Sequence, residues 1–263
     1  MIKRRLILTL LFAALASNAY AASFVNGNFE AGDATGWTTG TGYRASVNNT
    51  TLNPVDLLPG GSLYDASLIH SSIVSPGLVP ETANQLNQVY SGNYSWRVED
   101  QTTGGYGSAI QQQVNNYTDP QIFFAWAAVL EGAHDVDDAA TVKVVLRDLT
   151  AGTDLIVRLF NAASSGSGVD PRFNYEASTN MYWTPWQVEN FTMPAGALGH
   201  DILLSILASD CQPTGHEGFL FLDGFGAVAP PPVDGTIPEP ATMVLFGSGL
   251  VGLIRARYKK KAF

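Results

Sequence analysis

Gln121-Ile-Phe-Phe-Ala-Trp-Ala-Ala-Val-Leu130 is a nearly unbroken run of apolar and aromatic residues in the middle of the chain. A strand that is covered on one face only alternates apolar with polar residues, whereas a strand covered on both faces is apolar throughout. This run therefore predicts a central strand that is buried on both faces, and the other segments are expected to be arranged around it.

Shorter segments on either side of this run alternate in the way that is typical of half-covered strands. In the clearest of them, Tyr94, Trp96 and Val98 are separated by polar residues. Turns rich in glycine and proline divide these segments from one another. Further strands are expected at 108–114, 141–149, 154–160, 186–193, 202–209 and 219–228. About eight such strands predict an all-β fold, an antiparallel β-sandwich of the jelly-roll kind.

Residues from about 44 to 90 interrupt this pattern. They are dense in turn-forming sequences such as Asn53-Pro54 and Pro59-Gly60-Gly61, and their apolar residues are sparse. We interpret them as a loop-rich insertion that packs on a single β-sandwich domain spanning 22–228. About 205 residues between the two chain ends are enough for one sizeable hydrophobic core.

The N-terminal residues have the three parts of a secretory signal peptide. Lys3, Arg4 and Arg5 form a charged start, an apolar stretch follows, and Ala19-Tyr20-Ala21 provides a small-residue cleavage site. Residues 1–21 are therefore predicted to be a signal peptide, and the protein is predicted to be exported.

The C-terminal residues carry a second targeting pattern. A proline-rich spacer at 229–237 leads to Pro238, Glu239 and Pro240, and then to an apolar run at 241–254. Basic residues end the chain, namely Arg255, Arg257, Lys259, Lys260 and Lys261. As a helix, the apolar run would be roughly 21 Å long, so it could span a membrane only with thinning or snorkelling. The basic cluster is expected to stay in the cytoplasm, which puts the domain outside.

The order of Pro-Glu-Pro triplet, apolar span and basic tail resembles the PEP-CTERM sorting signal of Gram-negative bacteria. The resemblance covers residues 238–263 and implies recognition and cleavage near the triplet by an exosortase-type membrane protease. It further implies transient anchoring in the inner membrane, followed by transfer to the cell envelope or extracellular matrix.

The charge of the part between the two ends is strongly negative. Residues 22–240 keep six of the 14 basic residues and all 23 acidic residues, a net charge of −17. Such a surface repels nucleic acid and attracts cations, so nucleic acid is excluded as a partner. The only cysteine, Cys211, cannot form an intramolecular disulfide; it is either a small buried side chain or a thiol that pairs with another chain.

The two ends of the domain resemble galactose-binding-like jelly rolls, a group that includes carbohydrate-binding modules. The resemblance rests on Asn26-Gly-Asn-Phe-Glu30 with Gly36-Trp37, and on Phe221-Leu-Asp-Gly-Phe225. It implies a structural Ca²⁺ between the first and last strands, bound by the Asn28 carbonyl, Glu30 and Asp223, with further carbonyls near 91–94. The alternative is that Glu30 and Asp223 cap turns through backbone N–H groups.

The same resemblance implies glycan contact through aromatic rings and amides. Gln111 and Gln113 share one strand face, and Tyr182 and Trp183 belong to an aromatic cluster with Trp186. Rings stack on the C–H faces of sugars while amides bond their hydroxyl groups. The alternative is that Trp186 and Trp126 belong to the core and that the glutamines form a solvated face.

No catalytic motif is present in the sequence. His-Glu-x-x-His, Cys-x-x-Cys and Gly-x-Ser-x-Gly are absent, and the four histidines have no metal-ligand spacing. The region from Asp210 to Asp223 resembles a Cys-x-x-x-Gly-His-x-Gly-aromatic element of some bacterial surface proteins. There, Cys211 and His216 are either a nucleophile pair or part of a loop held by backbone hydrogen bonds.

The sequence therefore predicts an exported, non-catalytic protein of the cell envelope or exopolysaccharide matrix. Its role is predicted to be adhesive or structural, with extracellular polysaccharide as the candidate partner. The alternative is an extracellular hydrolase that acts on matrix glycans. That enzyme would need two carboxylates at a fixed separation, and the acidic residues are scattered along the sequence.

Overall fold

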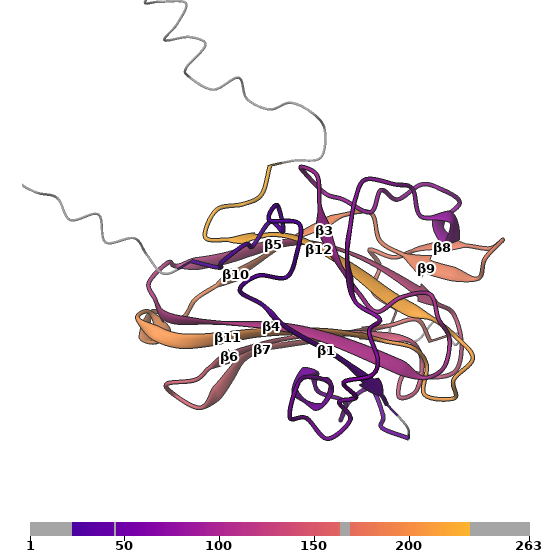
Figure 1. Cartoon of the computed structure of the whole chain (residues 1–263), viewed down its shortest axis with the longest axis horizontal. Helices are drawn as coiled ribbons and strands as arrows, with labels where there is room; N and C mark the ends of the chain where they lie inside the picture. The colour runs from indigo at the N-terminus through magenta and orange to yellow at the C-terminus, as the bar shows by residue number, and fades with distance from the viewer. Residues whose placement is uncertain (1–22, 45, 164–168, 232–263) are drawn as a thin grey trace, which may run out of the picture.

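The computed structural model describes residues 23–44, 46–163 and 169–231 (Figure 1). Within these residues the chain forms two antiparallel sheets. The five-stranded sheet has the order β1 (Thr38–Tyr43), β4 (Tyr106–Tyr117), β11 (His200–Ser209), β6 (Thr141–Asp148) and β7 (Thr153–Asn161). The seven-stranded sheet has the order β2 (Ser72–Val74), β3 (Ser95–Val98), β12 (Gly218–Gly226), β5 (Gln121–Glu131), β9 (Met181–Trp183) and β8 (Asn174–Glu176), while β10 (Gln187–Thr192) also pairs with β5.

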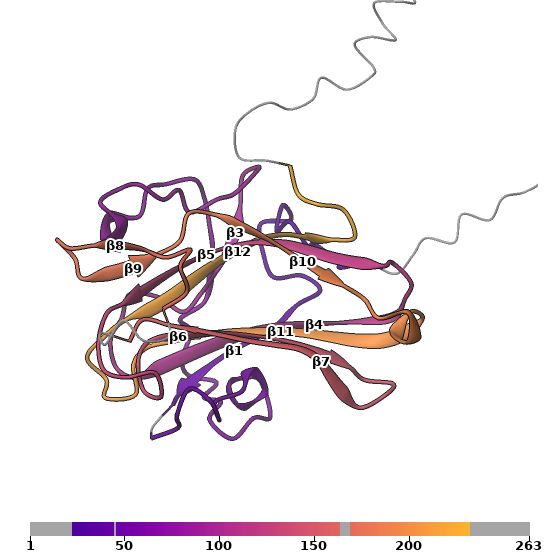
Figure 2. The same ribbon diagram turned by 180° about the vertical axis from the view of Figure 1, so that it is seen from behind.

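The two sheets lie face to face, as both views show (Figures 1 and 2). Successive strands cross between them: β4 is in the five-stranded sheet, β5 in the other, β6 in the first again, and β11 and β12 repeat the change. All pairings are antiparallel, so the predicted all-β sandwich of the jelly-roll kind is confirmed.

Strand β5 is buried on both faces, as its apolar run predicts. Side chains that alternate along it, including Phe124 and Trp126, belong to the main core between the sheets. Ala127 and Val129 point the other way, into a second apolar cluster on the outside of the seven-stranded sheet. The remaining members of that outer cluster are Val79, Leu86, Met181, Trp183, Phe219 and Phe221.

Residues 44–90 supply the cover for both outer faces. The turn η1 (Pro54–Leu57) and its neighbours place Leu52, Leu57 and Leu58 against the outside of the five-stranded sheet. The later part, with η2 (Pro80–Thr82), places Val79 and Leu86 on the outside of the seven-stranded sheet. Val55, Ile69 and Leu78 of this segment are exposed, but its buried apolar residues fasten it to both sheets.

A buried arginine fixes the start of this segment. Arg44 is 0% exposed and donates hydrogen bonds to the carbonyl oxygens of Asp210 (2.7 Å) and Val47 (2.7 Å) and to Oδ1 of Asn49 (2.8 Å). Asn49 in turn donates to the carbonyl of Ala139 at 3.0 Å. Because these partners lie at the end of β11 and just before β6, one side chain ties the segment to the body of the sandwich.

Candidate functional site

The predicted cation site lies where the N-terminal residues meet β12. The backbone N–H of Phe225 donates to the carbonyl of Gly27 at 2.8 Å, which joins the two segments. Asp223 is 1% exposed, and its Oδ2 accepts the N–H of Ser91 at 3.1 Å. Its Oδ1 has no hydrogen-bond partner among the described residues. Burial raises the pKa of Asp223 to about 7, and the negative charge of Glu30 adds to this effect.

Glu30 binds the same loop. Its Oε1 accepts the N–H groups of Asn93 (2.8 Å) and Tyr94 (3.0 Å), and its Oε2 accepts the side-chain amide of Asn93 (2.9 Å). Burial acts in the opposite direction, but these bonds lower the pKa of Glu30. Asn28 lies in the same turn and is exposed. The structure therefore brings together the residues that the resemblance implies. Both carboxylates do bind backbone N–H groups, yet one buried oxygen of Asp223 remains without a partner.

The two predicted glutamines share the outer face of the five-stranded sheet. Gln113 is exposed, and Gln111 is half-buried and accepts a hydrogen bond from Ser205 Oγ at 3.4 Å. Gln112, between them, points into the sandwich, where its amide binds both backbone groups of Val25 (2.6 and 2.9 Å). Sequence reasoning missed this structural role of Gln112. Side chains alternate between the two faces of a strand, so Gln112 is expected to point to the opposite face from Gln111 and Gln113.

A groove lies beside the two glutamines. It has a volume of about 450 Å³ and is formed between the η1 turn and strands β6, β7 and β11. Gln111 and Gln113 lie directly opposite Ser205 and Leu203 of β11, which are part of its wall. The other residues of the wall are Asn53, Pro54, Val55, Val145, Arg147, Leu149 and Asp154. The wall thus combines apolar side chains with an amide, a hydroxyl group and an ion pair.

The predicted aromatic residues lie elsewhere. Trp183 is 6% exposed and belongs to the apolar cluster outside the seven-stranded sheet, together with Val129 and Phe219. Tyr182 is half-buried, and its ring centroid lies 4.9 Å from that of Tyr175. Tyr182 packs against the main core between the two sheets. Neither ring therefore reaches the outer face of the five-stranded sheet, where Gln111 and Gln113 lie. Its burial makes Trp183 a core residue of this outer cluster.

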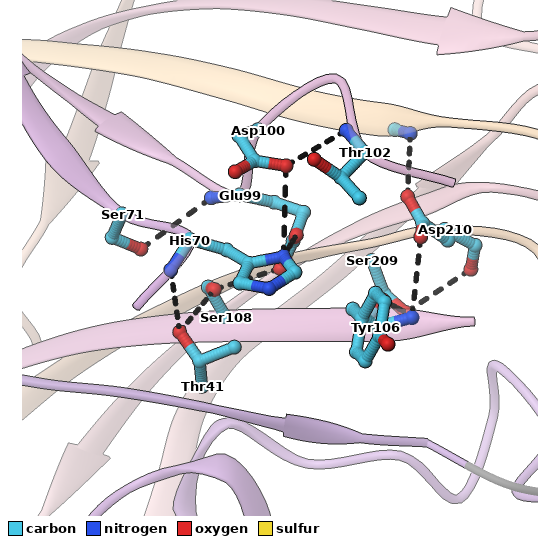
Figure 3. Close-up of polar contacts among 11 residues, drawn as sticks. Thr41, His70, Ser71, Glu99, Asp100, Thr102, Tyr106, Ser108, Ser209 and Asp210 are labelled. Carbon is cyan, nitrogen blue, oxygen red and sulfur yellow. Dashed lines mark hydrogen bonds and ion pairs between the residues drawn. The ribbon is translucent and has the colours of Figure 1, made fainter. Parts of the chain in front are cut away.

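A buried polar network links β1, β3 and β4 to the insertion (Figure 3). His70 Nδ1 lies 2.7 Å from Glu99 Oε1 and 3.5 Å from Asp100 Oδ1. The other oxygen of Glu99 accepts the hydroxyl of Ser108 at 2.7 Å, and Glu99 itself is 0% exposed with a left-handed backbone (φ 63°). Sequence reasoning missed this network, because Glu99 reads as one more polar position in the alternation that starts at Tyr94.

Asp210 lies next to this network and is also fully buried. Its carboxylate accepts the N–H groups of Tyr106 and Gly218, each at 3.2 Å. Burial raises the pKa of Asp210 to about 8, and the charge of Glu99 contributes. The structure thus gathers acidic residues that are scattered in the sequence. Their oxygens face hydrogen-bond donors of the protein, and Ser108 donates to a carboxylate instead of an imidazole, unlike the serine of a hydrolase triad.

The contact between His70 and Glu99 predicts a pH-dependent stability. The hydrogen bond to Glu99 raises the pKa of His70, against the opposing effect of burial, and the charges of Glu99, Asp100 and Asp210 add to the increase. A raised pKa means that this contribution is complete below about pH 6.5, the ordinary histidine value, and is lost as pH rises through the folded pKa. The melting temperature of the parent should exceed that of His70→Gln most below pH 6.5, and the gap should narrow at higher pH. A gap that does not change with pH would contradict the assignment.

The predicted sorting residues lie outside the described residues. They are Pro238, Glu239, Pro240, Arg255 and Arg257. None of the helices within 23–44, 46–163 and 169–231 is long and apolar enough to cross a membrane.

A comparison with protein-family models does cover the tail. Residues 236–260 match the PEP-CTERM protein-sorting motif. The PEP-CTERM motif confirms the sequence-based interpretation of this segment, and it implies export with a transient C-terminal membrane anchor.

A comparison with curated proteins finds no match. Among solved structures, the chain is similar to the module TmCBM61 in complex with β-1,4-galactotriose (11% identity, TM-score 0.41, 78% of this chain and 97% of that one). It is also similar to CBM27-1 of Caldicellulosiruptor saccharolyticus in complex with mannohexaose (13%, 0.38, 76% and 94%). A third is CBM28, a module specific for non-crystalline cellulose (9%, 0.37, 76% and 92%).

Proposed function

We propose that this protein is a non-catalytic polysaccharide-binding domain of the cell envelope or extracellular matrix. In this proposal the PEP-CTERM segment holds it transiently in the inner membrane, where an exosortase-type protease recognises it, and the domain then has an adhesive or structural role outside. The observation that carries the binding function is the groove on the outer face of the five-stranded sheet.

The groove has the size and the chemistry that an oligosaccharide needs. Its volume of about 450 Å³ falls in the range that is typical of small-molecule sites, roughly 300–1,000 Å³. Val145, Leu203 and Pro54 offer apolar contact to C–H groups, while Ser205 and the amide of Asn53 can bond hydroxyl groups. Gln111 and Gln113 extend this polar wall along β4. A neutral sugar is favoured over an anion, since residues 22–240 carry six basic against 23 acidic residues.

The buried acids support a binding role over the alternative hydrolase. A glycosidase needs one carboxylic acid and one carboxylate that reach the scissile bond from two sides. Glu99 and Asp210 are 0% exposed, and the oxygens of both are already bonded by His70, Ser108, Tyr106 and Gly218. The acid at the groove, Asp154, is paired with Arg147 at 2.6 Å.

The polar surface beside the groove is tested by removing its two amides on β4. Gln111→Ala combined with Gln113→Ala should weaken binding to a panel of soluble β-linked oligosaccharides, galactotriose and mannohexaose among them, by at least about fivefold. This magnitude follows from two hydrogen bonds of roughly 0.5–1.5 kcal/mol each. The matched control is Gln187→Ala on the seven-stranded sheet, which should bind like the parent. A double variant with unchanged affinity would remove the groove from the proposal, and a parent that binds no glycan would refute the binding function.

We also propose that Glu30, Asp223 and the Asn28 carbonyl hold a structural calcium ion. Calcium prefers several oxygen ligands, among them carboxylates and backbone carbonyls. The two carboxylates meet at the loop 91–94, and the unpartnered Oδ1 of Asp223 is buried where a lone charge would be costly. A cation there would satisfy this oxygen and would join the opening segment to the last strand.

A further inference from the structure

Three metal-ligating side chains from two separate loops meet at one end of the sandwich. His134 lies in the loop between β5 and β6, and Cys211 and His216 lie in the loop between β11 and β12. His134 Nε2 is 3.0 Å from His216 Nδ1, and Cys211 Sγ is 3.4 Å from the same nitrogen. All three donor atoms lie within 4.8 Å of one another. This cluster is separate from the groove and from the calcium position.

Two of the distances between the donor atoms are near those of a tetrahedral transition-metal site, and the third is at most 4.8 Å. With Zn–N and Zn–S bonds of about 2.0–2.3 Å, tetrahedral geometry places the donor atoms roughly 3.3–3.6 Å apart. The distances of 3.0 and 3.4 Å are close to these values, so small side-chain adjustments would suffice. The loops that carry the residues are joined by backbone bonds, from Gln212 N to Asp138 O (2.8 Å) and from Glu131 N to Glu217 O (2.9 Å), which fix their relative position.

The sulfur atom is held as a hydrogen-bond acceptor. Cys211 is 0% exposed, and the backbone N–H of His216 points at its Sγ from 3.2 Å. Burial raises the pKa of this thiol, whereas backbone N–H groups of His216, Gly215 and Thr214 act to lower it. Backbone donors around a sulfur stabilise the thiolate. A bound metal ion would supply the positive charge that a buried thiolate needs.

The donor set distinguishes among metal ions. Calcium and magnesium take oxygen ligands, whereas imidazole together with thiolate suits zinc and its neighbours among the transition metals. Three protein ligands leave the fourth position of a tetrahedral zinc open to water or to a group of another molecule. His134 and His216 are only half-buried, so an ion from solvent can reach them while the sulfur stays protected.

We propose that His134, Cys211 and His216 bind one zinc-class transition-metal ion. On binding, the thiol proton of Cys211 is released to solvent and a metal–thiolate bond forms, with the imidazoles as neutral ligands. The ion would clamp the β5–β6 loop to the β11–β12 loop. It would cross-link two loops of a chain that has one cysteine, as a disulfide does in other exported domains.

The test uses cobalt as a spectroscopic substitute for zinc. The full chain, purified in detergent and stripped of metal under reducing conditions, is titrated with Co²⁺. Because Cys211 is the only cysteine, a thiolate-to-cobalt charge-transfer band reports on this site alone. We expect the band to saturate at one Co²⁺ per chain, to disappear on adding Zn²⁺ and to persist in excess Ca²⁺. A chain that shows no such band would overturn the proposal.

Variants make the test specific to the three ligands. Cys211→Ser should abolish the band. His134→Ala changes a half-buried loop residue that the fold should tolerate, and it should weaken cobalt affinity at least about tenfold, as expected when one of three ligands is lost. His200→Ala is the matched control, because His200 is also half-buried but pairs with Asp148 at 2.7 Å where β11 begins and β6 ends. If His134→Ala binds cobalt as tightly as His200→Ala, the proposed site is wrong.

Discussion

Replacing Arg44 with methionine is expected to lower the free energy of unfolding by about 3–5 kcal/mol, because three acceptors lose their donor and each buried unsatisfied acceptor costs roughly 1–3 kcal/mol. Burial lowers the pKa of Arg44 to about 10, so the side chain is still charged at neutral pH. Methionine would fill a similar volume but would leave the carbonyls of Asp210 and Val47 and the amide oxygen of Asn49 without their donor. Chemical denaturation of parent and variant would measure the loss.

The matched control for Arg44 is Arg147→Met. Arg147 binds Asp154 at 2.6 Å, but both side chains are 42% exposed. An exposed pair contributes about 0–1 kcal/mol, so this variant should unfold almost like the parent. The insertion should also become sensitive to proteases in the Arg44 variant, since its attachment to β11 is lost. Equal stability of the two variants would show that the buried network does not hold the insertion.

Calcium is expected to raise the melting temperature of the parent, and a chelator is expected to lower it. An ion that binds only the folded state stabilises it by about 2.7 kcal/mol at a hundredfold excess over its dissociation constant. For a domain of this size that corresponds to roughly 5–10 °C. Glu30→Gln combined with Asp223→Asn should remove the dependence on calcium. Calorimetry in millimolar calcium and in chelator measures both effects.

Asp65→Asn combined with Glu176→Gln is the matched control for the calcium variant. These carboxylates are turn caps: they accept the N–H groups of Ser67 and Ser178, at 2.8 and 3.1 Å, on exposed turns. They represent the alternative role for Glu30 and Asp223, and their loss should leave the calcium response intact. A parent that melts at one temperature in chelator and in calcium would assign Glu30 and Asp223 to the same capping role.

The strands could be predicted because each is long enough to alternate or to be apolar throughout. The expected strand at 141–149 is β6 at Thr141–Asp148, and that at 202–209 is β11 at His200–Ser209. Strands β2, β8 and β9 have three residues each, too few to show a period. Strand β1, Thr-Thr-Gly-Thr-Gly-Tyr, lacks aliphatic residues altogether and pairs through its backbone with β4.

The candidate sites were less accessible to sequence reasoning because they join distant segments. Glu30 and Asp223 were found only through the motifs at the two ends of the domain. Cys211 and His216 are close in sequence, but His134 joins them only because β5 and β12 pair, which brings the loops beside them together. For Trp183, the sequence could not show on which side of the sheet its ring would lie or that residues 79–86 would cover it.

The position of β12 has a consequence for the order in which the protein is made and delivered. This strand lies between β3 and β5 in the seven-stranded sheet, yet it is the last strand of the described chain. Only nine residues separate Gly226 from the start of the PEP-CTERM match at 236, a reach of at most about 30 Å. In an exported chain that emerges from its N-terminus, the sheet keeps a vacant place between β3 and β5 until the residues just before the PEP-CTERM match have emerged. Until then β3 and β5 each expose an unpaired strand edge, and an incomplete sheet of this kind is prone to aggregation.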